Sequence, residues 1–93
     1  MNYTVKHSKE NVYARACLKC NKIVLGVKWR GLPSVLRSFI LLHEEGHLNG
    51  MDSEIDADTY AYNKQKDDRI FRLLELYNLR TLENIKLLKE NVK

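Results

Sequence analysis

The strongest constraint on the fold is a helical pattern between residues 33 and 50. Apolar side chains recur there three or four positions apart, which is the spacing of one helix face. The apolar positions are Val35, Leu36, Phe39, Ile40 and Leu42. Either Pro33 takes the first helical position or Ser34 is the N-cap, and Gly50 is a typical C-terminal stop. The sequence therefore predicts a helix that ends near Leu48.

An H-E-x-x-H motif, His43-Glu44-Glu45-Gly46-His47, lies within this helix. Residues i and i+4 share a helix face, so the two imidazoles can reach one zinc ion. Glu44 lies about 100° around the helix from His43, beside the metal but outside its ligand set. There it can act as general base toward zinc-bound water. We predict His43 and His47 as zinc ligands and Glu44 as catalytic base; the alternative is a pair of packed or surface histidines.

A catalytic zinc needs a third protein ligand and a position open to water. Ser53-Glu54-Ile55-Asp56 resembles a capping box with Asp in the last place, which predicts a second helix over residues 53–65. Glu54, in the first turn just after the Gly50 break, is the predicted ligand. Its rivals are Asp52, Asp56 and Asp58. Asp58 lies on the same face as Glu54 and is suited to orient a ligand histidine through its free N–H.

At these residues the chain resembles the gluzincin metallopeptidases, in which a downstream glutamate joins the two motif histidines. Glu54-Ile55-Asp56-Ala57-Asp58 matches the E-x-x-A-D form of the second motif. That form resembles the membrane heat-shock and prenyl-protein proteases and the soluble ImmA/IrrE-type proteases of phages and mobile elements. The resemblance covers about residues 34–62. The zinc ligands that it implies are His43, His47 and Glu54. Glu44 is then the base, and Asp58 supports a ligand.

The sequence departs from those families in two ways. Only six residues separate His47 from Glu54, and no membrane-spanning segment flanks the motif. The metzincin pattern, H-E-x-x-H-x-x-G-x-x-H/D, matches through Gly50 but has Ser53 at its third-ligand position. The metzincin interpretation is therefore set aside.

The N-terminal third has the composition of β-strands. Residues 12–17 and 22–29 are β-prone, and Cys20-Asn21-Lys22 between them is typical of a hairpin turn. Gly26 in the second run is typical of a bulge. Helical spacing returns in the C-terminal region after residue 68. We expect an α+β fold with a small antiparallel sheet packed on the motif helix, in a minimal zincin-like domain over residues 1–93.

Cys17 and Cys20 form one C-x-x-C pair. In an intracellular protein they would be reduced thiols in a strand or turn. As an alternative, they could complete a structural Cys2His2 zinc site with His43 and His47, which would make the chain a zinc-stabilised binding module. The 22 residues between Cys20 and His43 exceed the spacing of about 12 in a zinc finger.

Charge and hydropathy limit the possible partners. The net charge is +4, and only Lys28-Trp29-Arg30 forms a local basic cluster, so the charge indicates a solvated surface and no nucleic-acid partner. The longest apolar run, residues 39–42, is far shorter than the ~20 residues of a membrane span. The N-terminus has no apolar signal core. We therefore expect a cytoplasmic protein.

Together, these features predict a zinc metalloendopeptidase that acts on a peptide or protein substrate. The edge of the sheet could bind an extended peptide, as in zincins. Candidates for stabilising the oxyanion, by residue type only, are Tyr60, Tyr62 and His7. A third possibility is a catalytically idle zincin that oligomerises or joins a larger assembly through its leucine-rich C-terminal helices.

Overall fold

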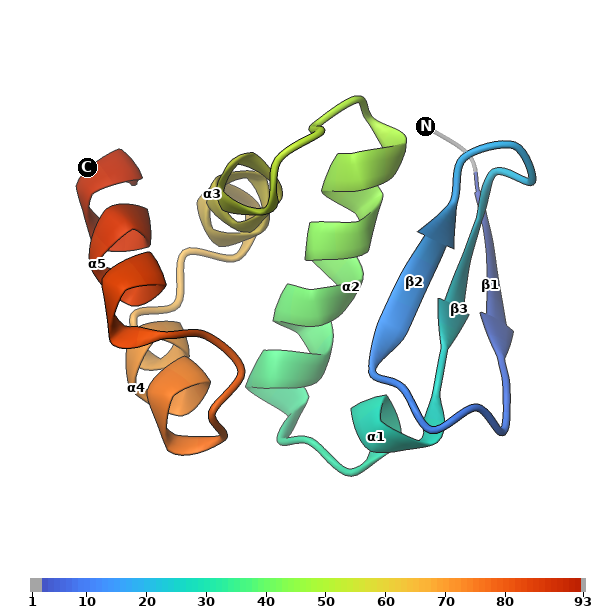
Figure 1. Ribbon diagram of the computed structural model, residues 1–93, viewed down its shortest axis with the longest axis horizontal. Coiled ribbons are helices and arrows are strands. Elements are labelled where there is room, and N and C mark those ends of the chain that lie inside the picture. Colours follow the sequence, from blue (N-terminus) through green and yellow to red (C-terminus); the bar gives the residue numbers. More distant parts are fainter. Residues whose placement is uncertain (1–2, 93) are drawn as a thin grey trace.

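A small sheet forms one end of the molecule in the computed structural model, which describes residues 3–92 (Figure 1). Its strands are β1 (Thr4–His7), β2 (Ala14–Cys17) and β3 (Lys22–Leu25), in the spatial order β1-β3-β2. The β2–β3 hairpin is antiparallel, as predicted, whereas β1 is parallel to β3. The chain reverses twice, and β3 then inserts between the first two strands. The α+β class is confirmed, but the sheet is mixed rather than wholly antiparallel.

The second predicted strand is shorter than expected. β3 ends at Leu25, and α1 (Val27–Arg30) replaces the predicted extension to Trp29. Gly26 lies between the two elements, where the chain meets the loop before β2. A Cβ atom on Gly26 would lie 2.2 Å from the carbonyl oxygen of Val12. Gly26 therefore ends the strand and allows this close approach, and the predicted bulge is wrong.

Helix α2 (Ser34–Leu48) lies between the sheet and the other helices (Figure 1). Pro33 is its N-cap and Ser34 its first residue, one position from each predicted alternative. The carbonyl of Pro33 accepts the first helical hydrogen bond, from the N–H of Arg37. Beyond the helix, Gly50 has a φ of +97°, a conformation that favours glycine. The predicted stop is confirmed.

Helix α3 (Glu54–Gln65) follows and packs across α2 (Figure 1). The Ser53 hydroxyl accepts a hydrogen bond from the N–H of Asp56, as the capping pattern predicted. Helices α4 (Arg69–Leu76) and α5 (Leu82–Asn91) follow. The core between α2 and these three helices contains Leu36, Phe39, Ala61, Ile70, Leu74, Ile85 and Leu88. Burying these side chains holds the C-terminal helices against α2.

Among residues 3–92, no helix has both the length and the apolar character needed to cross a membrane.

Candidate metal centre

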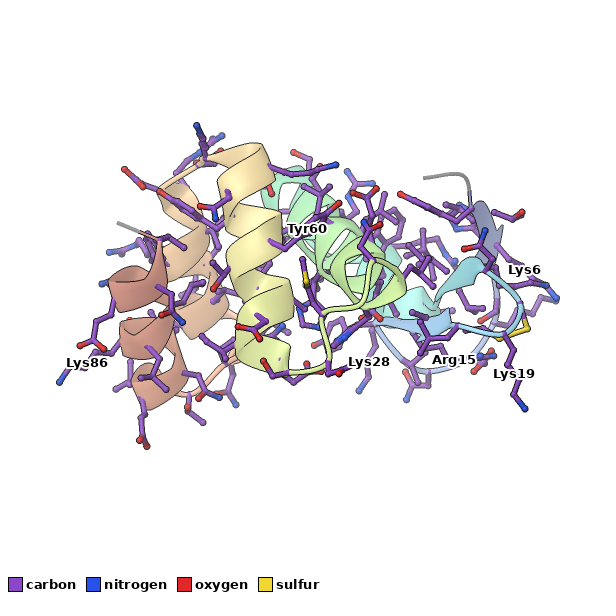
Figure 2. All side chains as sticks on the ribbon, turned by 90° about the horizontal axis from the view of Figure 1, so that it is seen from above. Lys6, Arg15, Lys19, Lys28, Tyr60 and Lys86 are labelled. Carbon is purple, nitrogen blue, oxygen red and sulfur yellow. A yellow bond between two sulfur atoms is a disulfide. The ribbon has the colours of Figure 1, made fainter. Side chains whose placement is uncertain are left out.

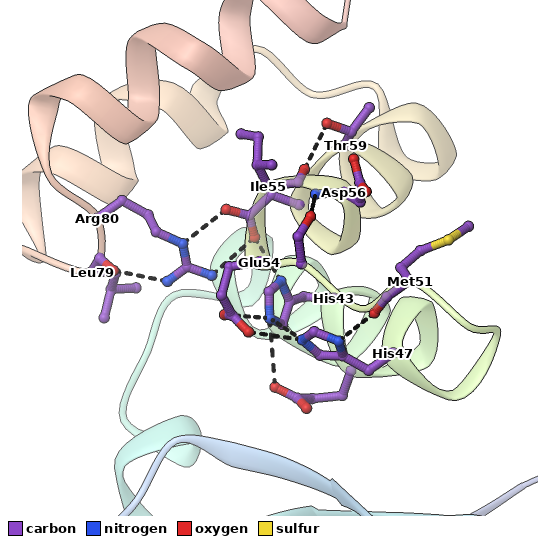
Figure 3. A network of polar contacts seen from close by, with 12 residues as sticks. His43, His47, Met51, Glu54, Ile55, Asp56, Thr59, Leu79 and Arg80 are labelled. Atoms are coloured by element: carbon purple, nitrogen blue, oxygen red, sulfur yellow. Dashed lines mark hydrogen bonds and ion pairs between the residues drawn. The ribbon is translucent and has the colours of Figure 1, made fainter. Parts of the chain in front are cut away.

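Close packing of α2 against α3 brings the H-E-x-x-H motif beside Glu54 (Figure 3). Small residues allow this approach: a Cβ on Gly46 would lie 3.3 Å from the Cα of Ala57 and 3.1 Å from the ring of Tyr60. On the side of α2 away from the histidines, Glu45 accepts hydrogen bonds from the hydroxyls of Tyr3 and Tyr60 and from Lys64. The contacts from Tyr60 and Lys64 join α3 to the motif helix.

Three potential ligand side chains converge where the two helices meet. The Nε2 atoms of His43 and His47 lie 3.2 Å apart. The Glu54 carboxylate lies against both, with Oε2 3.1 Å from His43 Nε2 and Oε1 3.0 Å from His47 Nε2. Among residues 3–92, this is the one group of three His, Cys, Asp or Glu side chains found close enough to share a metal ion. Glu54 is 72% exposed, so the centre is open to solvent on its side.

Hydrogen bonds at the far side of each ring determine which nitrogen is protonated. His43 Nδ1 lies 2.6 Å from Asp58 Oδ1, and His47 Nδ1 lies 2.6 Å from the carbonyl oxygen of Met51. Both Nδ1 atoms must carry the hydrogen, because a carboxylate and a carbonyl can only accept. In the neutral rings, both Nε2 atoms then present lone pairs to each other and to Glu54. Such an arrangement is stable only with a cation between the atoms, either a metal ion or a proton.

Asp58 is a buried carboxylate with three hydrogen-bond donors around it. Besides His43, it accepts bonds from Arg80 Nε at 2.8 Å and from Arg80 Nη2 at 2.9 Å. Burial alone would raise the pKa of Asp58, but the hydrogen bonds from His43 and Arg80 outweigh it and lower the pKa. Asp58 therefore remains an anion at neutral pH, as an acceptor for the His43 N–H requires.

Glu44 lies beside the three potential ligands without joining them. Its Oε2 is 3.9 Å from His43 Nε2, and its side chain is 12% exposed. Burial raises the pKa of the Glu44 carboxyl above its ordinary value, and the neighbouring imidazoles offset this only in part. A carboxyl group in such a place can exchange a proton with a molecule bound at the centre.

A pocket of about 270 Å³ adjoins this centre. Its walls include Tyr13 and Ala14, at the start of edge strand β2, and Arg80, from the α4–α5 connection. Glu44 and Glu54 face the same pocket. The sheet edge and the potential ligands therefore border one space.

The other candidates from the sequence lie elsewhere. Asp56 is exposed, and its N–H donates to the hydroxyl of the N-cap Ser53. None of the three residues proposed for the oxyanion lines the pocket beside the centre. Tyr60 bonds to Glu45, Tyr62 to Asp68, and His7 lies beside Arg30. Asp52 is exposed and does not belong to the group of potential ligands.

Two residues of the site were missed in the sequence. Arg80 holds Asp58, and Tyr13 lines the pocket. Neither belongs to a motif: Arg80 lies in the C-terminal region, outside both motif segments, and Tyr13 is one of several aromatic residues in the chain. No local signal distinguishes them.

The cysteines do not belong to this centre. Cys17 and Cys20 form a disulfide across the β2–β3 turn, which corrects the expectation of reduced thiols. The turn brings their Cα atoms to 5.2 Å, within the range that a disulfide can join. Figure 2 shows the bond at the sheet end of the molecule, near Lys19. A Cys2His2 site with His43 and His47 is therefore ruled out in this structure.

Comparison with models of known protein families, with curated proteins and with solved structures gave no match to this chain.

Proposed function

We propose that the chain is a zinc-dependent peptidase of the gluzincin type that hydrolyses peptide bonds. One observation carries the proposal: the convergence of His43 Nε2, His47 Nε2 and the Glu54 carboxylate, with Glu44 beside them. Two imidazoles and one glutamate are a ligand set of catalytic zinc sites. A peptide or protein substrate is part of the same proposal.

The distances between the ligand atoms fit zinc. With bonds of about 2.0–2.1 Å, a tetrahedral ion would separate its ligand atoms by roughly 3.3–3.4 Å. The two Nε2 atoms lie 3.2 Å apart, and each lies 3.0–3.1 Å from one of the two Glu54 carboxylate oxygens, so small adjustments would seat the ion. The ring orientations support the same assignment, because the partners of both Nδ1 atoms leave Nε2 free to bind. With three protein ligands, one tetrahedral position would remain for water or substrate.

The neighbouring residues support hydrolysis as the reaction. Bound zinc would supply an acidified water molecule and polarise the scissile carbonyl. Glu44, close to the ligands but outside their contacts, would take a proton from the attacking water and pass it to the leaving amine. Strand β2 pairs only with β3 among residues 3–92, so its other edge can accept an extended peptide beside the pocket.

The proposal is tested with the purified chain, zinc and a library of unstructured peptides. We expect wild-type protein to bind zinc and cleave peptides. Glu44→Gln should bind zinc with similar affinity and lose at least a hundredfold in cleavage rate. Glu83→Gln, the same change at an exposed position of α5, should behave as wild type. Cleavage by Glu44→Gln at the wild-type rate would refute the assigned base, and absence of zinc binding would refute the whole proposal.

Exposed apolar side chains favour a second candidate, a catalytically idle zincin in a larger assembly. Leu76 and Leu82, at the α4–α5 connection, are 67% and 66% exposed. Exposed apolar side chains of this kind can form part of a protein interface. In this case wild-type protein would bind zinc and cleave none of the peptides, and Leu82→Ser would shift its sedimentation coefficient toward that of the monomer.

A further inference from the structure

The C-terminal helices reach the metal centre through Arg80 (Figure 3). Arg80 lies between α4 and α5, directly before the α5 N-cap Thr81. Its backbone position is determined locally. Leu79 donates its N–H to the carbonyl of Leu74, and Thr81 accepts a hydrogen bond from the N–H of Asn84. The docked position of α4 and α5 therefore determines where the guanidinium group lies.

The guanidinium group holds the Asp58 carboxylate through two hydrogen bonds. Its Nε and Nη2 bond to separate oxygens of the carboxylate, while Nη1 donates to the carbonyl oxygen of Leu79 at 2.8 Å. A two-point contact of this kind fixes the plane of the carboxylate as well as its distance. The Asp58 side chain is only 3% exposed, so the carboxylate end of this contact is shielded from water.

The same carboxylate orients one potential metal ligand. Asp58 Oδ1 accepts hydrogen bonds from both Arg80 Nη2 and His43 Nδ1. A tilt of the carboxylate plane would therefore turn the His43 ring or break its hydrogen bond. Partners that orient a ligand histidine typically change metal affinity 10- to 100-fold when they are altered.

We propose that Arg80 is a positioning residue for metal binding, which fixes Asp58 so that His43 directs Nε2 toward the ion. Docking of the C-terminal helices and metal affinity are then coupled, and the coupling acts equally in both directions. This inference rests on the metal site of the proposed function, and it does not depend on hydrolysis.

The positive charge of Arg80 should weaken metal binding, whereas its two-point contact with Asp58 should strengthen it. A cation near the site repels a metal ion, so a purely electrostatic role predicts tighter binding when the charge is removed. Lysine separates the two effects, because it keeps the charge but lacks the planar two-point contact of arginine. The positioning role predicts that Arg80→Lys binds metal more weakly, whereas the electrostatic role predicts no change.

The test measures zinc and cobalt(II) affinity by competition with a chelator, in the full chain. We expect Arg80→Lys and Arg80→Gln to bind both ions about tenfold more weakly, with a changed visible absorption of bound cobalt. Arg69→Lys is the matched control, because Arg69 bonds Asp67 through the same side-chain groups but is 72% exposed. Its affinity should equal that of wild type. Circular dichroism shows whether each variant is folded.

Two further measurements make the test decisive if a variant is destabilised. In wild type, zinc should slow hydrogen exchange of the α5 amides. In Arg80→Lys, this protection by zinc should fall by about the same factor as the zinc affinity. The loss of affinity in the double variant Asp58→Asn/Arg80→Lys should be less than the product of the two single losses, because both act through one contact. Wild-type affinity in Arg80→Lys, or tighter binding in Arg80→Gln, would overturn the inference.

The inference and the proposed function fail in different ways. Wild-type protein that binds zinc and cleaves no peptide would refute the enzyme and leave the role of Arg80 intact. Cleavage by wild type together with unchanged affinity in both Arg80 variants would refute the role of Arg80 alone.

Discussion

Replacing Asp58 by asparagine tests how the buried network holds the candidate metal centre. The aspartate accepts three N–H groups, one from His43 and two from Arg80. Asparagine has the same shape but only one acceptor oxygen, and its NH2 group must face a donor. If the amide oxygen accepts hydrogen bonds from His43 and Arg80 Nη2, the NH2 group faces the Nε–H of Arg80, which is also a donor. In the other orientation, the NH2 group meets His43 Nδ1 and favours the wrong tautomer.

Either orientation has a cost that the structure allows us to estimate. A hydrogen bond to a charged group contributes about 1.5–3 kcal/mol, and breaking a buried ion pair costs about 3–5 kcal/mol. Arg80 is 20% exposed and can regain some hydration, so the lower values apply. We expect Asp58→Asn to reduce the free energy of unfolding by about 2–3 kcal/mol without metal. Zinc affinity should fall about 10- to 100-fold.

Urea denaturation in the presence of a chelator measures the first quantity, and chelator competition measures the second. Asp56→Asn is the matched control, because Asp56 is on the same helix but is exposed. Its free energy of unfolding should fall by at most about 1 kcal/mol, because the variant loses only the favourable interaction of the Asp56 charge with the helix dipole. A loss below about 1 kcal/mol in Asp58→Asn, with wild-type zinc affinity, would refute this account of the network.

Three further predictions concern stability. Because the pKa of Asp58 is lowered by folding, the stability that it contributes is present above its unfolded pKa of about 3.9 and is lost as the pH falls through the folded pKa. Wild type and Asp58→Asn should therefore converge in stability below about pH 4; a constant difference down to pH 2 would contradict the linkage. Tyr60→Phe removes one of three donors to Glu45 and should cost about 1–2 kcal/mol in urea denaturation, whereas the exposed Tyr77→Phe should cost nearly nothing. Gly26→Ala should reduce the free energy of unfolding by more than about 2 kcal/mol, because its Cβ would overlap the carbonyl of Val12. Gly31→Ala is the control, because the nearest atom to its Cβ would be 3.7 Å away. Equal stability of the two variants would refute the close approach at Gly26.

The sequence determined the motif helix and its ends because the signals are local. Apolar spacing, the cap at Ser53 and the left-handed Gly50 each depend on residues within one or two turns. The same locality placed His43 and His47 on one helix face. The short link from α2 to α3 made Glu54 a reasonable candidate before its position was known.

Only the tertiary structure decided which other side chains reach the centre. Arg80 and Asp58 are 22 residues apart, and their contact depends on how α4 and α5 pack against the core. The parallel pairing of β1 and the end of β3 at Leu25 depend equally on segments that meet across the fold. Such contacts form only when the path of the whole chain brings distant residues together, and hydrophobic burial, which is non-directional, determines that path. No short pattern in the sequence carries this information.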